Sequence, residues 1–145
     1  MNARVSSIQR FSVGDGPGIR TTVFFSGCSL HCPWCHNPET IPLRPRLLYT
    51  AALCAACGHC AAVCCRHTLE NGVHRWSSAS CDGCLACTEV CYPHALKPSF
   101  TVMTLEEVWS TVEEDAPFYA ESGGGVTLSG GEALLQADFC AALAE

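Results

Sequence analysis

Cysteine is the residue type in this sequence that is most able to bind metals, and its spacing is regular. The chain has 13 cysteines among 145 residues. Three of them, Cys28, Cys32 and Cys35, form a C-x3-C-x2-C pattern in one short stretch. A 4Fe–4S cluster normally takes four thiolates, so a trio holds three irons and leaves the fourth without a protein ligand. An open coordination position is typical of catalytic metals, and the pattern therefore predicts a reactive cluster.

Two other metal sites are compatible with the same trio. One is a structural zinc ion, and the other is a cluster completed by a distant fourth cysteine. Zinc sites usually present two C-x2-C pairs separated by a gap, which this tight trio lacks. Both readings are therefore kept as the less favoured alternatives.

Most of the other cysteines belong to an internal repeat. Seven residues recur 27 positions further along the chain: Cys54, Cys57, Cys60, Val63, Cys64, His67 and Leu69 reappear as Cys81, Cys84, Cys87, Val90, Cys91, His94 and Leu96. Each copy carries C-x2-C-x2-C-x3-C, the run found in bacterial two-cluster ferredoxins, where the fourth cysteine of each run ligates the other cluster. Two further clusters are expected, one on Cys54, Cys57, Cys60 and Cys91, the other on Cys81, Cys84, Cys87 and Cys64.

Some residues depart from this run or lie outside it. Cys65 and Tyr92 stand where the run usually has proline, so the choice between Cys64 and Cys65 as ligand is left open. Cys140 is expected to be a small buried apolar residue. His59, His67 and His94 are not expected to be ligands, because eight regularly spaced thiolates suffice for two clusters.

The secondary-structure signals place these cysteines within an α/β pattern. A buried strand at 21–25 leads directly into the trio. Thr104 has a capping-box sequence that predicts a helix with Leu105, Val108 and Val112 on one face. A strand at 126–128 and a second helix, with Leu135, Phe139, Ala142 and Leu143 on one side, follow. Strand, helix, strand and helix predict an α/β fold with a parallel sheet, whose ligands gather beyond the carboxyl ends of the strands.

Three segments are expected: 1–47 with the first strand and the trio, 48–99 with the repeat, and 100–145 with the return to α/β patterning. A complete α/β barrel takes about 200 residues or more. We therefore expect a fragment that ends inside a helix and is poorly stable alone. A cooperative thermal transition of these 145 residues would contradict that expectation.

The composition excludes several classes of protein. The formal net charge is −6, and the eight lysines and arginines form no run. Nucleic-acid binding needs clustered basic residues, so no nucleic-acid partner is expected. No apolar stretch approaches the roughly 20 residues of a membrane span, and residues 1–13 carry no apolar core of a signal peptide. Dense cysteine without a secretion signal is typical of metal binding in a reducing compartment, so we expect a cytoplasmic metalloprotein.

Two motifs together resemble the radical SAM superfamily. The first is the trio with Trp34 just before its last cysteine, and the second is Gly130-Gly131-Glu132 after the later strand. The resemblance implies that S-adenosylmethionine chelates the open iron, and that one electron cleaves it to methionine and a 5′-deoxyadenosyl radical. It also implies a cofactor site: Trp34, Cys35 and His36 beside the adenine, Gly130 and Gly131 at a close backbone approach, and Glu132 accepting from the methionine ammonium.

Longer motifs resemble one family, the glycyl radical enzyme activating enzymes. They are 15–20 (DGPGIR), 35–39 (CHNPE) and 123–132 (GGGVTLSGGE). The resemblance implies the start of a partial (β/α) barrel, interrupted by a ferredoxin-like insert with two clusters, so that there are three 4Fe–4S clusters in all. The radical then takes hydrogen from a glycine of a partner glycyl radical enzyme, with flavodoxin or ferredoxin as electron donor. The partner stays open among choline lyase, diol dehydratase and arylacetate decarboxylase types.

Other roles remain as alternatives at this point. The chain could be a two-cluster ferredoxin-like electron carrier without radical chemistry, or a zinc-binding interaction module. The trio and the Gly-Gly-Glu motif favour the enzyme, because a carrier needs neither. No catalytic side chain beyond the cluster and the S-adenosylmethionine site is expected. The insert is either an electron relay or a segment whose metal sites stabilise its fold. Separately, Asp15 and Arg20 either help to dock the partner or hold a turn.

Overall fold

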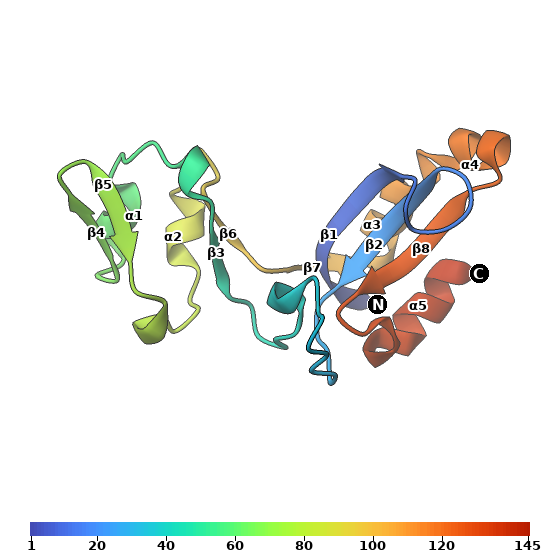
Figure 1. Ribbon diagram of the computed structural model, residues 1–145, viewed down its shortest axis with the longest axis horizontal. Helices are drawn as coiled ribbons and strands as arrows, with labels where there is room; N and C mark the ends of the chain where they lie inside the picture. The colour runs from blue at the N-terminus through green and yellow to red at the C-terminus, as the bar shows by residue number, and fades with distance from the viewer. The chain divides into compact units, whose positions relative to one another are not determined.

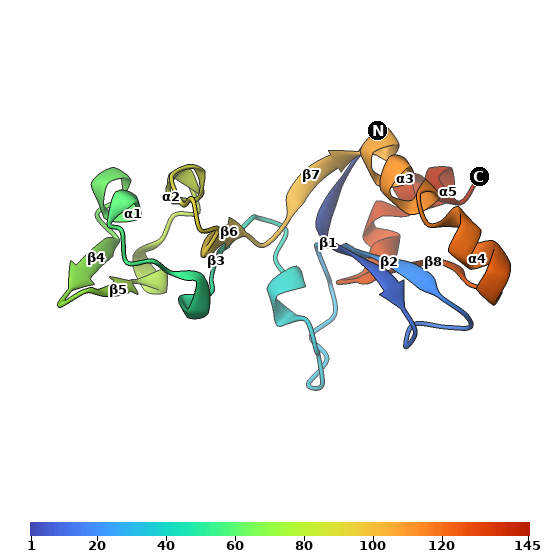
Figure 2. The ribbon, with the colours of Figure 1, turned by 90° about the horizontal axis from the view of Figure 1, so that it is seen from above.

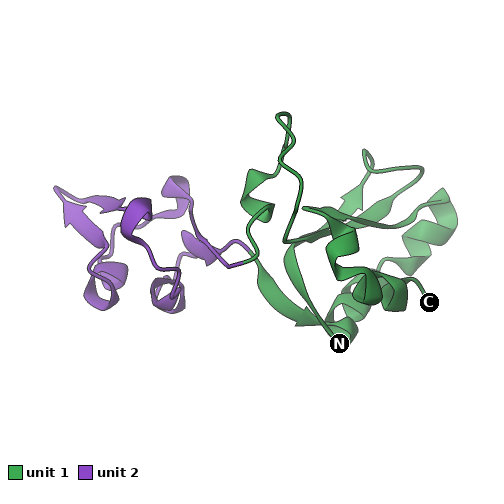
Figure 3. Ribbon diagram, turned by 90° about the horizontal axis from the view of Figure 1, so that it is seen from below, with its two compact units in different colours: residues 1–43, 100–145 green, residues 44–99 purple.

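The structure is a computed structural model that describes residues 1–145 as two units (Figure 3). The first unit combines 1–43 with 100–145, and the second comprises 44–99. The chain therefore leaves the first unit after the cysteine trio and returns to it beyond the repeat.

The first unit is built on one mixed sheet. Its strands are β1 (Asn2–Ser12), β2 (Arg20–Phe25), β7 (Thr101–Thr104) and β8 (Gly125–Gly130), in the order β7-β1-β2-β8 (Figure 1). β2 and β8 are parallel, whereas β1 is antiparallel to both β2 and β7. A connection between parallel strands must cross over the sheet, and here the crossover carries the whole second unit together with two helices.

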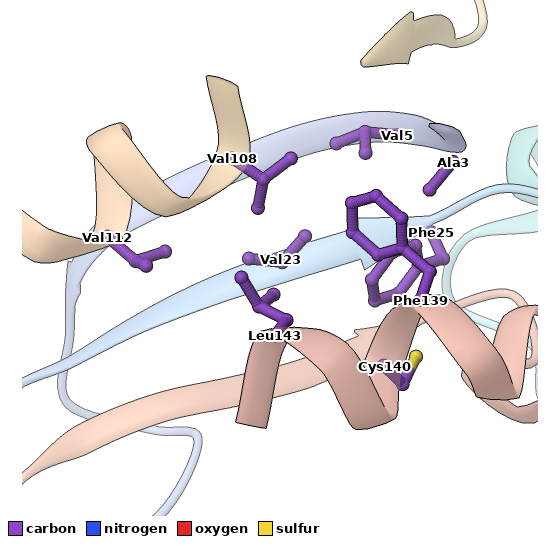
Figure 4. Packing of buried hydrophobic residues seen from close by; sticks show 9 residues of the cluster. All are labelled: Ala3, Val5, Val23, Phe25, Val108, Val112, Phe139, Cys140 and Leu143. Carbon is purple, nitrogen blue, oxygen red and sulfur yellow. The ribbon is translucent and has the colours of Figure 1, made fainter. Parts of the chain in front are cut away.

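Helices lie on one side of this sheet (Figure 2). They are α3 (Leu105–Glu113), α4 (Ala116–Ser122) and α5 (Ala137–Ala144), with short 3-10 turns η1 (Pro38–Thr40) and η4 (Ala133–Gln136). Alternate residues of β2 face the helices because side chains of a strand alternate between faces. Figure 4 shows Val23 and Phe25 packed against Val108 of α3 and Phe139 of α5, and all four are at most 2% exposed.

Most elements expected in this unit are present, with two differences. The strand at 21–25 is β2, the capping box of Thr104 opens α3, and the strand at 126–128 is β8. The second helix begins late: its first turn is η4, and Leu135 is 45% exposed instead of buried. The narrower 3-10 turn rotates this residue out of the face that carries Phe139. β1 and β7 were not expected from the sequence, and they make the sheet mixed instead of parallel.

The second unit folds as two interlocked copies of the repeat. Its elements are β3 (Leu47–Tyr49), η2 (Ala51–Leu53), α1 (His59–Val63), β4 (His67–Glu70), β5 (Val73–Trp76), η3 (Ser78–Ser80), α2 (Ala86–Glu89) and β6 (Leu96–Pro98). β4, which closes the first copy, pairs with β5, which opens the second; β6, which closes the second copy, pairs with β3. Each two-stranded sheet therefore contains one strand from each copy.

The backbone of the two copies matches in detail. Gly58 and Leu85, which are equivalent in the repeat, precede α1 and α2 with positive φ angles of 82° and 62°. Leu85 holds this conformation without being glycine, which is unusual for a branched side chain. The sequence repeat is therefore also a structural repeat. No helix anywhere in the structure is both long and apolar enough to cross a membrane.

Candidate functional site

Two residues separate the end of β2 from the cysteine trio. Ser26 and Gly27 are buried, and the amide of Gly27 donates to Thr40 over 2.7 Å, so both ends of the loop are joined at its base. Beyond Cys28 the loop is open to solvent: Cys32 is partly buried and Cys35 is exposed. Within the loop, the amide of Cys35 donates to the carbonyl of Cys32 over 3.1 Å. The strand therefore delivers three free thiols to one exposed loop at the carboxyl edge of the sheet.

The Gly-Gly-Glu motif lies beside the base of this loop. β8 runs parallel to β2, with Gly130 opposite Phe25. The amide of Gly131 donates to Phe25 and the amide of Glu132 donates to Gly27, both over 2.8 Å. Both sequence motifs therefore meet at the same edge of the sheet.

The two glycines of the motif are required by close backbone contacts. Gly130 has a φ of 107°, and a Cβ there would collide with the backbone of Phe25. A Cβ on Gly131 would collide with the carbonyl oxygen of Gly27. The sequence led us to expect close approach of a ligand at these glycines, whereas the structure shows the close approach of two chain segments to each other.

Glu132 ends this segment with its carboxylate partly engaged. Its Oε1 accepts a 3.0 Å hydrogen bond from the amide of Leu134 and so caps η4. The second carboxylate oxygen has no protein hydrogen bond in the structure. A partly buried carboxylate of this kind can accept from a cationic ammonium group, a charge-assisted contact stronger than a neutral one.

Trp34 and His36 extend from the trio loop into solvent. Trp34 is 75% exposed, and His36 is exposed as well. Packing in the protein core, the ordinary role of a tryptophan, therefore does not account for Trp34. Such a ring offers a flat apolar surface to a ligand at this loop.

In the second unit, four cysteines line one cavity: Cys54, Cys57, Cys60 and Cys91. This is the set expected for the first ferredoxin-like cluster, with three members from one copy and one from the other. Burial, and then the charges of Cys54 and Cys57, raise the pKa of Cys60. Thiols that repel each other's ionised forms in this way are stabilised as thiolates by a bound cation, so the donor set fits a metal cluster.

A second group of cysteines gathers around Cys87. Burial raises the pKa of the Cys87 thiol to about 11, and the charges of Cys64, Cys81 and Cys84 add to it. These are the four residues expected for the second cluster. Cys64 is the member from the first copy, while its neighbour Cys65 is exposed and is not among the residues that raise the pKa of Cys87. The choice of Cys64 over Cys65 as the ligand stays a prediction.

The spacing of the thiols does not suit a single zinc ion. Two sulfur ligands of a tetrahedral zinc lie about 3.8 Å apart, given zinc–sulfur bonds of about 2.3 Å. Only Cys60, His67 and His74 bring three ligand atoms within 4.8 Å of one another, and no three cysteines do so. A larger cluster, whose ligands spread around several irons, fits the cysteine groups better.

The loop of Asp15 and Arg20 lies at the other end of β2 from the trio. Asp15 accepts from the hydroxyls of Ser12 and Thr22 over 2.6 and 2.7 Å, and these bonds lower its pKa. Arg20 donates to the Thr127 hydroxyl over 2.6 Å. The structure therefore uses both side chains to hold the turn.

Two residues that line the first cavity, Tyr49 and His74, were overlooked in the sequence, whereas His67 was seen as a repeat position that is not expected to be a ligand. The Cys54 thiol beside Tyr49 raises the tyrosine pKa, and the tyrosine ring lies 4.8 Å from that of His74. His67 and His74 are buried, and burial lowers the pKa of both. The repeat contains an equivalent only for His67, which is the exposed His94, so no local signal pointed to this pair.

Comparison with known proteins agrees with the metal chemistry. A family model described as a 4Fe-4S single cluster domain matches residues 14–64. The chain is 48% identical over 144 residues to a (2S)-3-sulfopropanediol sulfolyase activating enzyme of Bilophila wadsworthia, an alignment that covers 96% of this chain and 48% of the relative. It is 46% identical to a choline trimethylamine-lyase activating enzyme of Oleidesulfovibrio alaskensis, covering 92% and 45%. It is 44% identical to a benzylsuccinate synthase activating enzyme of Thauera aromatica, covering 97% and 44%.

The cysteine loop of the α/β unit and these similarities indicate an iron–sulfur protein. Over nearly its whole length the chain is similar to part of several glycyl radical enzyme activating enzymes, in agreement with the resemblance seen in its motifs. It spans about half the length of the curated relatives that it matches.

Proposed function

We propose that the protein containing this chain is a radical SAM activating enzyme, which generates a radical on a glycine of a partner glycyl radical enzyme. The observation that carries this proposal is the hydrogen bond between Glu132 and Gly27, which joins the Gly-Gly-Glu turn to the base of the cysteine trio. A carboxylate and three thiols are thereby held at one edge of the sheet. This is the combination needed to bind an iron cluster and an amino-acid ligand side by side.

Cys28, Cys32 and Cys35 would hold the catalytic 4Fe–4S cluster in this proposal, beside a site for the amino and carboxylate groups of S-adenosylmethionine. The cluster would supply the single electron that cleaves S-adenosylmethionine to methionine and a 5′-deoxyadenosyl radical, and this radical would take the hydrogen atom from the glycine and become 5′-deoxyadenosine. Glu132 accepts from the methionine ammonium through its free oxygen. The backbone at Gly130 and Gly131 fixes the carboxylate relative to the loop, and Trp34, Cys35 and His36 flank the adenine.

The second unit is the proposed ferredoxin-like insert with two more 4Fe–4S clusters. Eight thiols in two groups support this assignment: Cys54, Cys57, Cys60 and Cys91, and Cys81, Cys84, Cys87 and Cys64. We propose an electron relay as its role, because each group would hold a redox centre with no open position. The first unit is then the start of a radical SAM partial barrel, of which β2 and β8 are the first two parallel strands.

The partner and donor follow from the same proposal. The relatives are named as activating enzymes for several different lyases and synthases. Their names support a glycyl radical enzyme as the protein substrate. A flavodoxin or ferredoxin is the proposed electron donor, and the cytoplasm is the proposed compartment, since the clusters need reduced thiols.

The proposal is tested by formation of 5′-deoxyadenosine. The complete protein, reconstituted with iron and sulfide without oxygen, should release it from S-adenosylmethionine when dithionite is added. Cys32→Ala should abolish the product, whereas Cys65→Ala, which changes an exposed thiol outside every proposed ligand set, should retain it. Equal product from Cys32→Ala and the unchanged protein would refute the proposal.

A further inference from the structure

A buried pair of histidines lies beside the first cysteine group of the insert. His67 of β4 and His74 of β5 are 3% and 7% exposed, and Nδ1 of His67 lies 2.9 Å from Nε2 of His74. Their rings are stacked, with centroids 5.1 Å apart. Two ring nitrogens at this distance share one proton, so one ring donates and the other accepts.

The other ring nitrogen of His74 has no hydrogen-bond partner. Its Nδ1 is the one buried side-chain nitrogen or oxygen in the structure without one. Leaving such a group unpaired costs about 1–3 kcal/mol, so we expect this nitrogen to have a hydrogen-bond partner outside the protein chain. His74 lines the same cavity as Cys54, Cys57, Cys60 and Cys91, and its ligand atom lies within 4.8 Å of that of Cys60.

The surroundings decide which nitrogen of His74 carries the proton. If Nδ1 of His67 donates to Nε2 of His74, then His74 in its neutral form holds its proton on Nδ1. The opposite arrangement leaves a bare nitrogen lone pair buried without a donor. The pair therefore gives His74, a residue that lines the cysteine cavity, a buried N–H donor without a partner in the chain.

The repeat contains its own comparison for this donor. The residue equivalent to His74, 27 positions earlier, is Leu47, which is 6% exposed and has no side-chain donor. The two cysteine groups have identical spacing, so the histidine is a clear chemical difference between their surroundings. The two cysteine groups of the insert therefore differ in the side-chain donors near them.

We propose that His74 donates an N–H···S hydrogen bond to the cluster on Cys54, Cys57, Cys60 and Cys91, with His67 holding the proton on the correct nitrogen. The inference rests on the insert clusters of the proposed function. Hydrogen bonds to the sulfurs favour the more negative, reduced state and raise the reduction potential of a cluster. This cluster is therefore reduced before its twin, and an electron that enters the insert resides on it. His74 is a positioning residue for the electron, not a ligand.

The test is a redox titration of the complete reconstituted protein followed by electron paramagnetic resonance. His74→Phe keeps the ring beside Tyr49 and removes the N–H. One of the cluster potentials should fall, so that the ratio of reduced to oxidised cluster at a fixed potential drops by about tenfold, which is 59 mV for one electron. His74→Asn, which returns an N–H near the same position, should recover much of the shift. His94→Phe, at the exposed equivalent of His67, should leave every potential unchanged.

A second measurement avoids variants that fail to fold. Pulsed resonance of the unmutated protein with 15N-labelled histidine should show a weak nitrogen coupling to one reduced cluster, and His94→Phe should keep it. Absence of this coupling overturns the inference, as does an unchanged potential in His74→Phe at equal iron content. Zinc bound to Cys60, His67 and His74 in place of iron also overturns it. None of these measurements involves S-adenosylmethionine, so the inference and the proposed cleavage activity can fail separately.

Discussion

The backbone amide of Glu132 donates a 2.8 Å hydrogen bond to the carbonyl oxygen of Gly27, the residue directly before Cys28. A proposed ligand-binding carboxylate and a proposed iron ligand are thus connected through a single backbone bond. Because both residues lie just beyond the paired ends of β2 and β8, where the backbone has little rotational freedom, the bond sets their spacing more firmly than a side-chain contact could.

Gly131→Ala should disturb the site through a steric collision, without backbone strain. The added methyl group would collide with the carbonyl oxygen of Gly27, although the backbone of Gly131 itself is not in the left-handed region. Forcing the segments apart should lower the free energy of unfolding by about 1–3 kcal/mol and reduce binding of S-adenosylmethionine more than iron content. Thermal unfolding and ligand binding measure the two effects.

The matched control for this change is Gly123→Ala. Gly123 has a φ of 67°, and a methyl group added there would meet no atom within 4 Å. Only backbone strain of about 1 kcal/mol is therefore expected from this variant. A binding defect as large in Gly123→Ala as in Gly131→Ala would contradict the role given to the Glu132–Gly27 bond.

Trp34→Ala should separate binding from stability. The side chain is 75% exposed, so its removal should change the free energy of unfolding by no more than about 0.5 kcal/mol. Loss of an aromatic surface beside the adenine should weaken S-adenosylmethionine binding by roughly fivefold, in line with about 1 kcal/mol for an aromatic contact. Calorimetric titration of the reconstituted protein gives the affinity, and unchanged affinity would assign the adenine contact elsewhere.

Cys91→Ser should remove a cluster from the insert even though Cys91 lies in the second copy of the repeat. It lines the cavity of the first group, with Cys54 and Cys60. Iron and sulfide analysis should therefore fall by about one cluster of four irons. Cys65→Ser should leave the iron content unchanged. Loss of iron in Cys65→Ser would give Cys65 the role proposed for Cys64, and unchanged iron in Cys91→Ser would remove Cys91 from the first group.

Because of Asp115, the free energy of unfolding should decrease at acid pH. Its carboxylate accepts from Nε of Arg10 over 2.9 Å and from the hydroxyl of Thr21 over 2.6 Å, and these partners, Arg10 first, hold its pKa below the ordinary value of 3.8. A lowered folded pKa means that the contribution is complete above about pH 3.8 and is lost as the pH falls through the folded pKa. The free energy of unfolding should therefore decline on acidification below that value.

Asp115→Asn tests this assignment. The side chain is 1% exposed, so losing its charge-assisted bonds should cost about 2 kcal/mol at neutral pH. The variant should also show a shallower decline below about pH 3.8, measured by denaturant unfolding across the acid range. An identical pH profile in both proteins would place the acid sensitivity on other carboxylates.

Local signals predicted the elements that carry the motifs. β2 is a run of β-favouring residues, and α3 begins at a capping box whose reciprocal bonds between Thr104 and Glu107 are present. Each signal depends on a few neighbouring residues, so it can be read without the fold. β1 and β7 could not be predicted in this way, because β1 has irregular burial and β7 has mostly exposed side chains. These strands form because each supplies the backbone hydrogen bonds that the other lacks.

The sequence by itself determined how the cysteines proposed to bind metal are grouped. Cysteine spacing within a short loop is a local property, and it predicted the trio at Cys28 and the two runs that begin at Cys54 and Cys81. Only the tertiary structure decided which distant groups meet: Glu132 with Gly27, Asp115 with Arg10, and His74 with the cavity of the first run. Such contacts join residues whose separation along the chain carries no information about their distance in space, and they exist only after the strands have paired.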